Sequence, residues 1–446
     1  LHHLLAAEFA GPFVLTSGNA SDEPIAYSDE EAVTRLAGIA DAFLVHDRPI
    51  HARADDSVVR VFAGEPLPVR RARGYAPQPL RLPRPAPRPI LGCGAELKST
   101  FCLARDGYAF VSPYLGDLKN YDTYRSYTTG ISHLVRLLGI APSIVAYDLH
   151  PDYLSTRYAK ELPDVELIGV QHHHAHIASC LADNGAPGPV IGVAFDGLGF
   201  GTDETIWGGE FLVADLAEAT RVGCLTPVPM PGGAAAVRQP WRMAAAYLRE
   251  AYRDAVPEDL AVVRRHAGQW RQMLAIADAG LNSPVTSSAG RLFDAVAALL
   301  GVRDVVSYEA QAAIELEQLA DPEVAEAYQA RFHPPGPTEM FQVDGADLVR
   351  AAAMDALDGV SPATIAGRFH RGMAEMVVHG AERIRDTTGL DTVALSGGVF
   401  GNVLLLDFTI PPLQRRGFTV LTHHQVPPND GGISLGQVAV AAARVS

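Results

Sequence analysis

The sequence has few cysteines, and no two of them are spaced to act together. Cys93, Cys102, Cys180 and Cys224 are scattered along 446 residues without a CxxC pair. This spacing supplies neither a disulfide framework nor a zinc ribbon, and it fits a reducing compartment. We therefore expect a cytoplasmic protein.

Long apolar runs and an excess of basic residues are also missing. No apolar run approaches the length of a bilayer-spanning helix and no signal peptide precedes the first domain, so we expect no membrane association. The formal net charge is −15. Because phosphate neutralisation supplies most of the affinity for nucleic acids, this balance argues against RNA or DNA as the main partner. The first residue is Leu1 rather than Met, which suggests a piece of a longer chain.

The residues that are present indicate a globular protein of two or three domains. Hydrophobic residues make up 48% of the chain and charged residues 20%. Prolines crowd residues 77–89 and predict an extended linker, because proline cannot donate the hydrogen bonds of a helix or a strand ladder. The predicted linker separates a small unit, residues 1–76, from a main body, residues 90–446.

The main body contains one pattern twice. Residues 90–117 and residues 190–215 each read as a strand, a glycine-rich turn and a second strand, which indicates a duplicated domain. Residues 234–330 are rich in Ala, Leu and Arg and predict a helical insertion, after which residues 392–398 and 418–424 return as strands. The predicted fold class is α/β, with two related lobes.

The stretch VQHHHAHIAS, residues 170–179, concentrates four histidines. A helix is predicted from His172 to the C-cap at Asn184 and Gly185. His172 and His176 then lie one turn apart on one face, as suits two imidazoles on one metal, whereas His173 and His174 point elsewhere. A solvated, polar first turn would produce the same pattern.

Two glycine-rich turns carry aspartates that could complete a metal site. FDGLGFG contains Asp196 and PPNDGGISLGQ contains Asp430, and a strand-end aspartate beside glycines can reach a cation. Two His and two Asp suit Fe(II), Zn or Mn. The alternatives are a turn-forming role for Asp196 and a helix N-cap role for Asp430.

Further glycine-rich turns predict a nucleotide cleft between the lobes. Gly397 and Gly398 in LSGGVFGN allow the backbone to approach a ligand at a helix N-terminus, and GAELKST places Lys98 near a similar turn. The sequence assigns no role to Asp148 or His150.

Polar and basic side chains gather in the N-terminal unit. In TSGNASDEP, Ser17 and Asn19 could bind a nucleotide, and in RRARGYAP the residues Arg70, Arg71 and Arg73 form a cationic cluster suited to phosphate or carboxylate. A polar turn and a solvated basic edge would explain the same residues.

Together these motifs resemble the HypF family, the carbamoyltransferases of NiFe-hydrogenase maturation. TSGNASDEP, HDRPIHARADDSVVR and RRARGYAPQPL resemble the end of its YrdC-like domain. Its actin-like (ASKHA) domain is matched by GAELKST, YDLHPDY, VQHHHAHIAS, FDGLGFG, ALSGGVFGN and PPNDGGISLGQ. The resemblance covers essentially the whole chain, and it implies a partial YrdC-like domain followed by a duplicated actin-like two-lobe domain.

The resemblance implies a carbamoyl-transfer reaction. In the family, carbamate from carbamoyl phosphate is activated with ATP to carbamoyl-adenylate in the YrdC-like domain. The actin-like domain then passes the carbamoyl group to the C-terminal cysteine of the partner HypE, for synthesis of the cyanide ligands.

The same match implies roles for individual residues. One divalent cation, Fe(II) or Zn ahead of Mn or Mg, would be held by the residues that are also expected to be catalytic: His172, His176, Asp196 and Asp430. The nucleotide in the main domain would be held by Gly397, Gly398 and Asn402. The adenylation site would include Ser17, Asn19, Arg70 and Arg73.

The chain also departs from the family pattern. It lacks the acylphosphatase domain, the CxxC zinc-finger region and the front of the YrdC-like domain, so the resemblance implies a fragment without full adenylation activity. Three other functions stay open: a small-molecule O-carbamoyltransferase, a tRNA threonylcarbamoyl-type enzyme and a nucleotide-binding scaffold without catalysis. Domain order counts against the small-molecule O-carbamoyltransferase, and the net charge counts against the tRNA-modifying enzyme. The His–Asp set counts against the scaffold, which needs no metal site.

Overall fold

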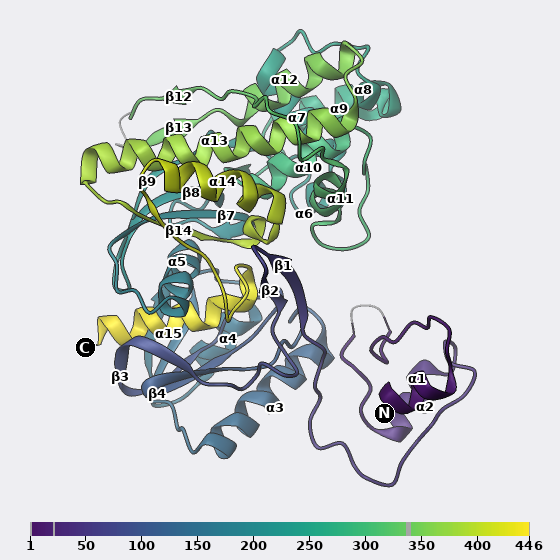
Figure 1. Cartoon of the computed structure of the whole chain (residues 1–446), viewed down its shortest axis with the longest axis vertical. Coiled ribbons are helices and arrows are strands. Elements are labelled where there is room, and N and C mark those ends of the chain that lie inside the picture. Colours follow the sequence, from purple (N-terminus) through teal and green to yellow (C-terminus); the bar gives the residue numbers. More distant parts are fainter. Residues whose placement is uncertain (1, 21–22, 336–339, 446) are drawn as a thin grey trace.

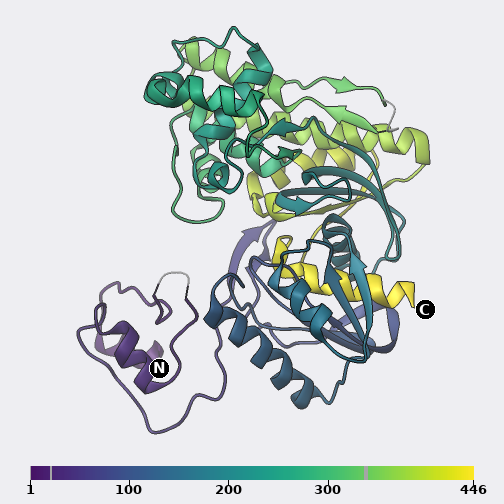
Figure 2. The same cartoon turned by 180° about the vertical axis from the view of Figure 1, so that it is seen from behind.

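The computed structural model describes residues 2–20, 23–335 and 340–445. These residues form an N-terminal unit and two lobes, with the N-terminal unit beside the lower lobe in Figure 1 and again in the reverse view of Figure 2. Among the described residues, we find no helix with the length and apolar character of a transmembrane span.

The two lobes repeat one sheet topology. In the first lobe the strand order is β4-β3-β5-β6, and in the second lobe the central order is β9-β8-β7-β14-β15. In each lobe the first strand (β3 or β7) pairs antiparallel with the next strand (β4 or β8) and parallel with a later one (β5 or β14). The predicted duplicated α/β fold is confirmed.

The first lobe is built from seven elements. They are β3 (Leu80–Gly92), β4 (Cys102–Val111), α3 (Tyr121–Leu138), β5 (Ile144–Asp148), α4 (Leu154–Glu161), β6 (Glu166–Val170) and α5 (His172–Asp183). Helix α3 ends at Gly139, whose left-handed backbone (φ 62°) forms the C-cap.

The second lobe begins with three antiparallel strands and ends with the C-terminal helix. Its elements are β7 (Val190–Phe200), β8 (Ile206–Ala214), β9 (Ala219–Leu225), α13 (Pro362–Thr388), β14 (Thr392–Ser396), η1 (Gly398–Gly401), α14 (Val403–Arg415), β15 (Thr419–Leu421), η2 (Asp430–Gly432) and α15 (Ile433–Arg444).

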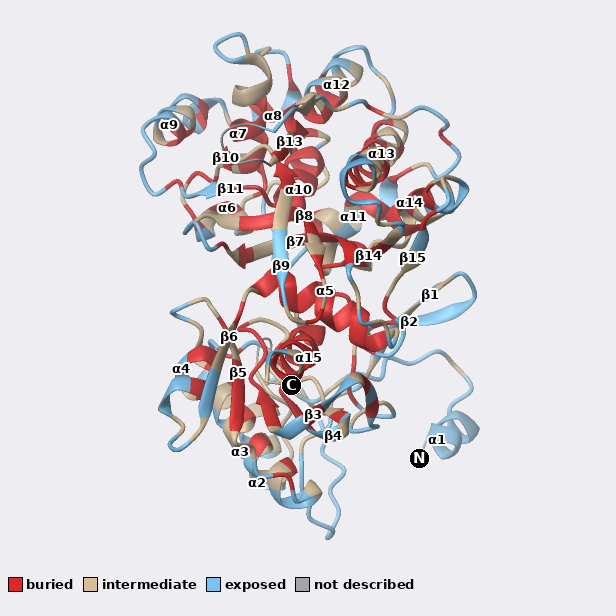
Figure 3. Cartoon of the chain, turned by 90° about the vertical axis from the view of Figure 1, so that its left-hand side faces the viewer, coloured by how far each residue is buried: buried red, intermediate tan, exposed pale blue. Residues whose placement is uncertain are grey.

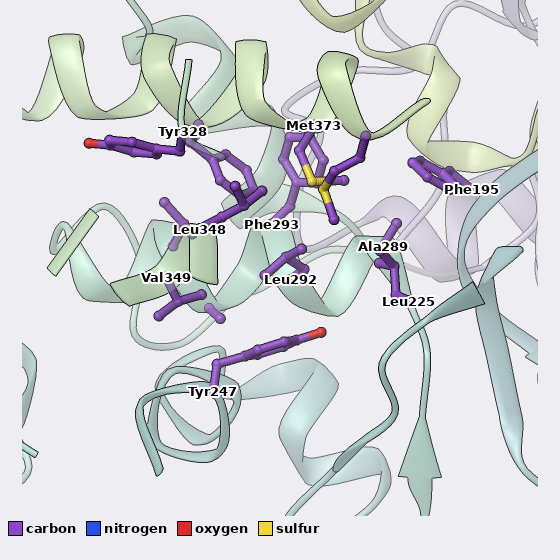
Figure 4. Close-up of a cluster of buried hydrophobic side chains, with 14 of the residues drawn as sticks. Phe195, Leu225, Tyr247, Ala289, Leu292, Phe293, Tyr328, Leu348, Val349 and Met373 are labelled. Carbon is purple, nitrogen blue, oxygen red and sulfur yellow. The ribbon is translucent and has the colours of Figure 1, made fainter. Parts of the chain in front are cut away.

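A mainly helical insertion lies between β9 and α13; it was predicted for residues 234–330, and its elements extend beyond these bounds on both sides. It contains β10 (Val228–Pro229), α6 (Ala234–Arg238), α7 (Trp241–Tyr252), α8 (Ala261–Arg265), α9 (Ala267–Asp278), β11 (Val285–Thr286), α10 (Ala289–Leu299), α11 (Gln311–Leu319), β12 (Phe332–His333), β13 (Phe341–Val343) and α12 (Gly345–Leu357). Phe293 of α10, Phe195 of β7 and Met373 of α13 belong to one buried core (Figure 4). This core anchors β7 beside Asp196.

The expected linker at residues 77–89 is wrong for most of its length, because β3 begins at Leu80. Between Leu80 and Ala86 this strand pairs with β4, and β5 joins on its other side only from Ile90. The prolines therefore occupy an open edge, where a missing N–H donor breaks no ladder hydrogen bond.

Helices α5 and α15 pack against each other between the two sheets (Figure 3). Helix α15 ends the second lobe in sequence but lies on β3 and β4 of the first, whereas α5 of the first lobe also contacts β7 and β14 of the second. Small residues allow the close approach, since a Cβ on Gly436 would lie 1.9 Å from the carbonyl oxygen of Ala175. The packing brings the start of α5 close to η2, which precedes α15.

The N-terminal unit contains α1 (His2–Glu8), α2 (Asp29–Leu36), β1 (Val58–Phe62) and β2 (Glu65–Arg70). Neither α1 nor α2 has a buried residue. Strands β1 and β2 form an antiparallel hairpin, which reaches the second lobe through Arg60.

Candidate functional site

The four residues predicted to bind a metal lie together in the structure. One donor atom from each of His172, His176, Asp196 and Asp430 lies within 4.8 Å of all the others. The Nε2 atoms of the two histidines are 3.4 and 3.5 Å from Oδ2 of Asp196, and both are 3.7 Å from Oδ1 of Asp430. Four donors about 2.1 Å from one zinc-sized cation would lie roughly 3.4 Å apart at tetrahedral angles. The spacing therefore suits one ion.

The two histidines are positioned by the start of α5. The side chain of Gln171 caps the helix and accepts hydrogen bonds from the backbone N–H groups of His173 and His174. His172 and His176 follow at i and i+4, so both rings face the same side. The helix ends at Asp183, as the Asn184–Gly185 pattern predicted.

Asp196 lies within a strand, so its predicted turn position is wrong. It belongs to β7, between Phe195 and Gly199, where the register with β8 shifts. At such an irregularity a side chain can be redirected without ending the strand. The carboxylate faces the histidines, and its Oδ1 accepts a hydrogen bond of 2.9 Å from the backbone N–H of Gly398.

Asp430 lies at the start of η2 but does not cap it. The cap is Asn429, whose side chain accepts a hydrogen bond from the N–H of Gly431. The Asp430 carboxylate is left to face His172 and His176. The alternative role of Asp430 as a helix N-cap is therefore not observed.

Asp148 supports the cluster, although the sequence assigned it no role. It ends β5, is almost fully buried, and its Oδ2 lies 2.7 Å from Nδ1 of His172. When Nδ1 carries the proton and donates it in a hydrogen bond to Asp148, Nε2 keeps a lone pair. That lone pair points toward the space between the other donors and can bind a cation. Within the described residues, Nε2 of His172 and Nε2 of His176 are buried without a hydrogen-bond partner, as expected of metal ligands.

The electrostatics of the cluster favour positive charge. Burial alone would lower the pKa of His172, but Asp148, with Asp196 and Asp430, raises it well above its ordinary value. Burial alone would raise the pKa of Asp196, but His172 and His176 hold it well below its ordinary value. A divalent cation would meet the same attraction from these carboxylates. The donor set thus fits a metal in both spacing and charge.

Among the described residues, the other histidines of the region do not join the four donors, and His173 and His174 were the two predicted to point elsewhere. His174 places Nε2 2.8 Å from the carbonyl oxygen of Asp215, and burial lowers its pKa to about 4. His173 packs beside Trp207, and burial holds its pKa well below the usual value. His150 stacks on Tyr153 at 4.1 Å.

Two of the predicted nucleotide-binding residues adjoin the cluster. Gly397 has φ 97°, and a Cβ there would lie 2.2 Å from the carbonyl oxygen of Phe195. A Cβ on Gly398 would lie 2.9 Å from Oδ1 of Asp196. Glycine is needed at these positions because the turn after β14 lies directly against β7.

Lys98 lies in the first lobe and reaches across to the insertion of the second. Its ammonium forms an ion pair with Glu309. Burial alone would lower the pKa of Lys98, but Glu309 and Asp430 raise it. Lys98 is therefore close enough to the cluster to interact with Asp430.

Asn402 lies next to the glycine turn, but its side chain forms hydrogen bonds within the protein. Its Oδ1 caps α14 by accepting from the N–H of Leu405, and its Nδ2 lies 2.9 Å from Nε2 of His370. His370 donates from Nδ1 to the carbonyl of Ala366, so Nε2 is the acceptor for Asn402.

The four residues predicted for the adenylation site lie in the N-terminal unit. Ser17 donates a hydrogen bond of 2.6 Å to Asn19, Arg70 pairs with Asp55 and Arg73 with Asp56. We find no hydrogen bond or ion pair from these four to the His–Asp cluster in the described part of the chain. Ser21 and Asp22 of the TSGNASDEP motif lie outside the described residues.

Family models cover most of the chain. A model described as HypF Kae1-like domain matches residues 85–183, and one described as Carbamoyltransferase, Kae1-like Domain, second subdomain, matches residues 192–437. The chain belongs to the HypF carbamoyltransferase family. Residues 1–72 match the Sua5/YciO/YrdC model, described as telomere recombination. The resemblance inferred from the motifs is confirmed.

Several HypF relatives are similar along the chain. It is 43% identical to carbamoyltransferase HypF2 of Cupriavidus necator over 97% of its own length and 56% of that protein. A HypF homolog of the same organism is 39% identical, with 79% of this chain and 91% of that one covered. The chain spans little more than half the length of HypF2 and of the Synechocystis HypF, to which it is 39% identical.

Two solved HypF structures share the fold. Full-length HypF in its phosphate- and nucleotide-bound form superposes with a TM-score of 0.93 at 40% identity, covering all of this chain and 69% of that one. The HypF of T. kodakarensis superposes with a TM-score of 0.84 at 31% identity, covering 96% of this chain and 57% of that one.

Proposed function

We propose that this chain carries out the carbamoyl-transfer step of HypF chemistry. The acceptor is the C-terminal cysteine of HypE, and the donor is carbamoyl-adenylate. The observation that supports this most directly is the convergence of His172, His176, Asp196 and Asp430 beside the Gly397–Gly398 turn. A carbamoyl-adenylate in this turn would place its reacting carbonyl close to the four donors.

In the proposed step, the thiolate sulfur forms a bond to the carbamoyl carbon. The bond from that carbon to the phosphate oxygen breaks, and AMP leaves with the electron pair. The product is a thiocarboxamide on HypE. A divalent cation, such as Fe(II) or Zn, held by the four donors would polarise the carbonyl or stabilise the departing phosphate.

The chain's own residues would prepare this site. Asp148 orients His172, and the N–H of Gly398 orients Asp196. Lys98 supplies a further positive charge for the phosphate of the nucleotide. Burial of both histidines and Asp196 limits competing attack by water.

ATP and carbamoyl phosphate enter through the N-terminal unit in this proposal, where Ser17, Asn19, Arg70 and Arg73 would take part in adenylation. A nucleotide-bound HypF relative supports nucleotide binding in this family. The cysteines of the chain are free and buried, which supports a cytoplasmic setting.

The test supplies carbamoyl-adenylate and a peptide that ends in the HypE C-terminal cysteine. We expect His172→Ala and Asp430→Asn to lose bound Zn and to lower the transfer rate at least about 100-fold, as removal of a metal ligand commonly does. Elemental analysis gives the metal content, and mass spectrometry detects the carbamoylated cysteine. His379→Ala, a half-exposed histidine on α13, is the matched control. Unchanged metal content in both site variants would contradict the assignment.

A further inference from the structure

The β1–β2 hairpin touches two segments next to the cluster, η1 and the loop before η2. We define the docking hairpin as residues 58–71, which include β1, β2 and Arg71. Its Phe62 and Leu67 pack against the core of the second lobe, and its polar contacts with the described part of that lobe fall in two places, one at η1 and one in the loop before η2. The first place adjoins Gly398, whose N–H orients Asp196, and the second directly precedes Asp430.

The first contact is made by Arg60. Its Nη1 donates 2.7 Å to Oε2 of Glu317 and 3.0 Å to the carbonyl oxygen of Gly401. Glu317 is buried, and its other oxygen accepts from the N–H of Val403 at the start of α14. Arg60 therefore holds the end of η1 and the start of α14 together.

This contact leads directly to the cluster. Gly401 ends η1, and Gly398 begins it. The N–H of Gly398 is the group that donates to Oδ1 of Asp196. A displacement of η1 would therefore displace the hydrogen bond that orients this carboxylate.

The second contact holds the loop before Asp430. Nδ2 of Asn429 donates 3.0 Å to the carbonyl oxygen of Val69 in β2. Arg71, which is almost fully buried, donates from Nε to the carbonyl oxygen of Gln425 and from Nη1 to that of Val111 in β4. The loop from residue 425 to residue 429 is thus attached to the hairpin at both ends.

We propose that the docking hairpin is a positioning element for the metal site, with Arg60 as its main positioning side chain. Attachment of the hairpin strengthens cation binding, and cation binding strengthens attachment of the hairpin to the same degree, because thermodynamic coupling is reciprocal. The N-terminal unit thereby senses whether the transfer site is loaded. This inference rests on the proposed function, because it assumes a cation on the four donors.

The test compares three variants of the full chain. Arg60→Met keeps the aliphatic stem and removes both hydrogen bonds. Arg60→Lys can restore both, because one nitrogen makes them in the native protein. Arg81→Met, on an exposed part of β3, is the matched control. Co(II) affinity is measured by visible absorption, and amide exchange of residues 397–404 is measured in the metal-free protein.

We expect Arg60→Met to weaken Co(II) binding by about five-fold or more, the lower range of typical coupling. Exchange at residues 397–404 should accelerate, and Arg60→Lys should recover most of both effects. Wild-type Co(II) affinity in Arg60→Met, or an equal loss in Arg81→Met, overturns the proposal. If Arg60→Met fails to fold, the reciprocal measurement decides: Co(II) should slow amide exchange of the docking hairpin in the native protein, and unchanged exchange refutes the coupling.

The same experiment separates this inference from the proposed function. Absence of Co(II) binding by the native protein would overturn the metal site itself. In that case, faster amide exchange at residues 397–404 in Arg60→Met would still support the structural link from the docking hairpin to η1. Unchanged exchange there would refute that link as well.

Discussion

Two of the four donor side chains are held by a hydrogen bond to a neighbouring group. Asp148 holds His172, the N–H of Gly398 holds Asp196, and capping by Asn429 leaves Asp430 free to face the histidines. Buried ligands need such support, because an imidazole or carboxylate that can rotate loses the geometry a metal requires.

We predict that Asp148→Asn weakens divalent-metal binding by about 10- to 100-fold, as loss of a carboxylate behind a ligating histidine typically does. The amide can still accept from Nδ1 of His172, so the ring stays in place while Nε2 becomes less basic. Competition with a chromophoric chelator measures the affinity. Asp152→Asn, at an exposed ion pair with Arg157, is the control. Native affinity in Asp148→Asn would exclude this role.

Among the elements, the junction of α13 and α14 depends on a buried neutral histidine. His370 of α13 donates to Ala366 and accepts from Asn402, the N-cap of α14. Burial lowers the pKa of His370 to about 4. The glycine turn that faces Asp196 leads directly into this junction.

We predict that His370 makes stability depend on pH. Because its folded pKa of about 4 lies below the ordinary 6.5, the unfolded state binds the proton more readily. Its stabilising effect is complete above pH 6.5 and is lost as pH falls through about 4, a difference on the order of 3 kcal/mol.

Urea unfolding at several pH values from about 7 to about 4 measures this dependence. Between these pH values the free energy of unfolding should decrease less in His370→Gln than in the native protein. The two decreases should differ by the contribution of His370 given above. The decrease in His370→Gln should not vanish, because burial also lowers the pKa of His174 to about 4 and of His423 to about 3. His379→Gln on the same helix is the control. An unchanged pH profile in His370→Gln would show that His370 does not contribute.

For the whole molecule, the Lys98–Glu309 ion pair joins the first lobe to the insertion of the second. Lys98 lies in the segment between β3 and β4, and Glu309 lies just before α11. Neither side chain is fully buried. The ion pair therefore spans the predicted nucleotide cleft at a point where solvent reaches it.

We predict that Glu309→Gln increases AMP affinity about two- to five-fold, because Lys98 then binds phosphate without breaking an ion pair of about 0.5–1 kcal/mol. Lys98→Met should weaken AMP binding. Calorimetric titration measures both. Unchanged affinity in both variants would show that Lys98 does not contact the nucleotide.

Features that depend on local chemistry could be predicted from the sequence. The i,i+4 spacing placed His172 and His176 on one face of α5, and glycine marked the ends of α3 and α5. The recurring strand–turn–strand pattern predicted the duplication. Each of these depends on residues close together in the chain, which is why periodicity and turn chemistry were sufficient.

Which side chains meet at the site depends on long-range packing, which the structure shows and the sequence does not. The packing of α5 against α15 brings Asp430 to the histidines, and a register shift inside β7 directs Asp196 toward them. The same long-range packing decides that Asp148 supports the site and that the proline-rich segment extends a strand. Such contacts join residues tens to hundreds of positions apart, and no local pattern carries them, because they form only when two sheets and the helices between them bury their surfaces together.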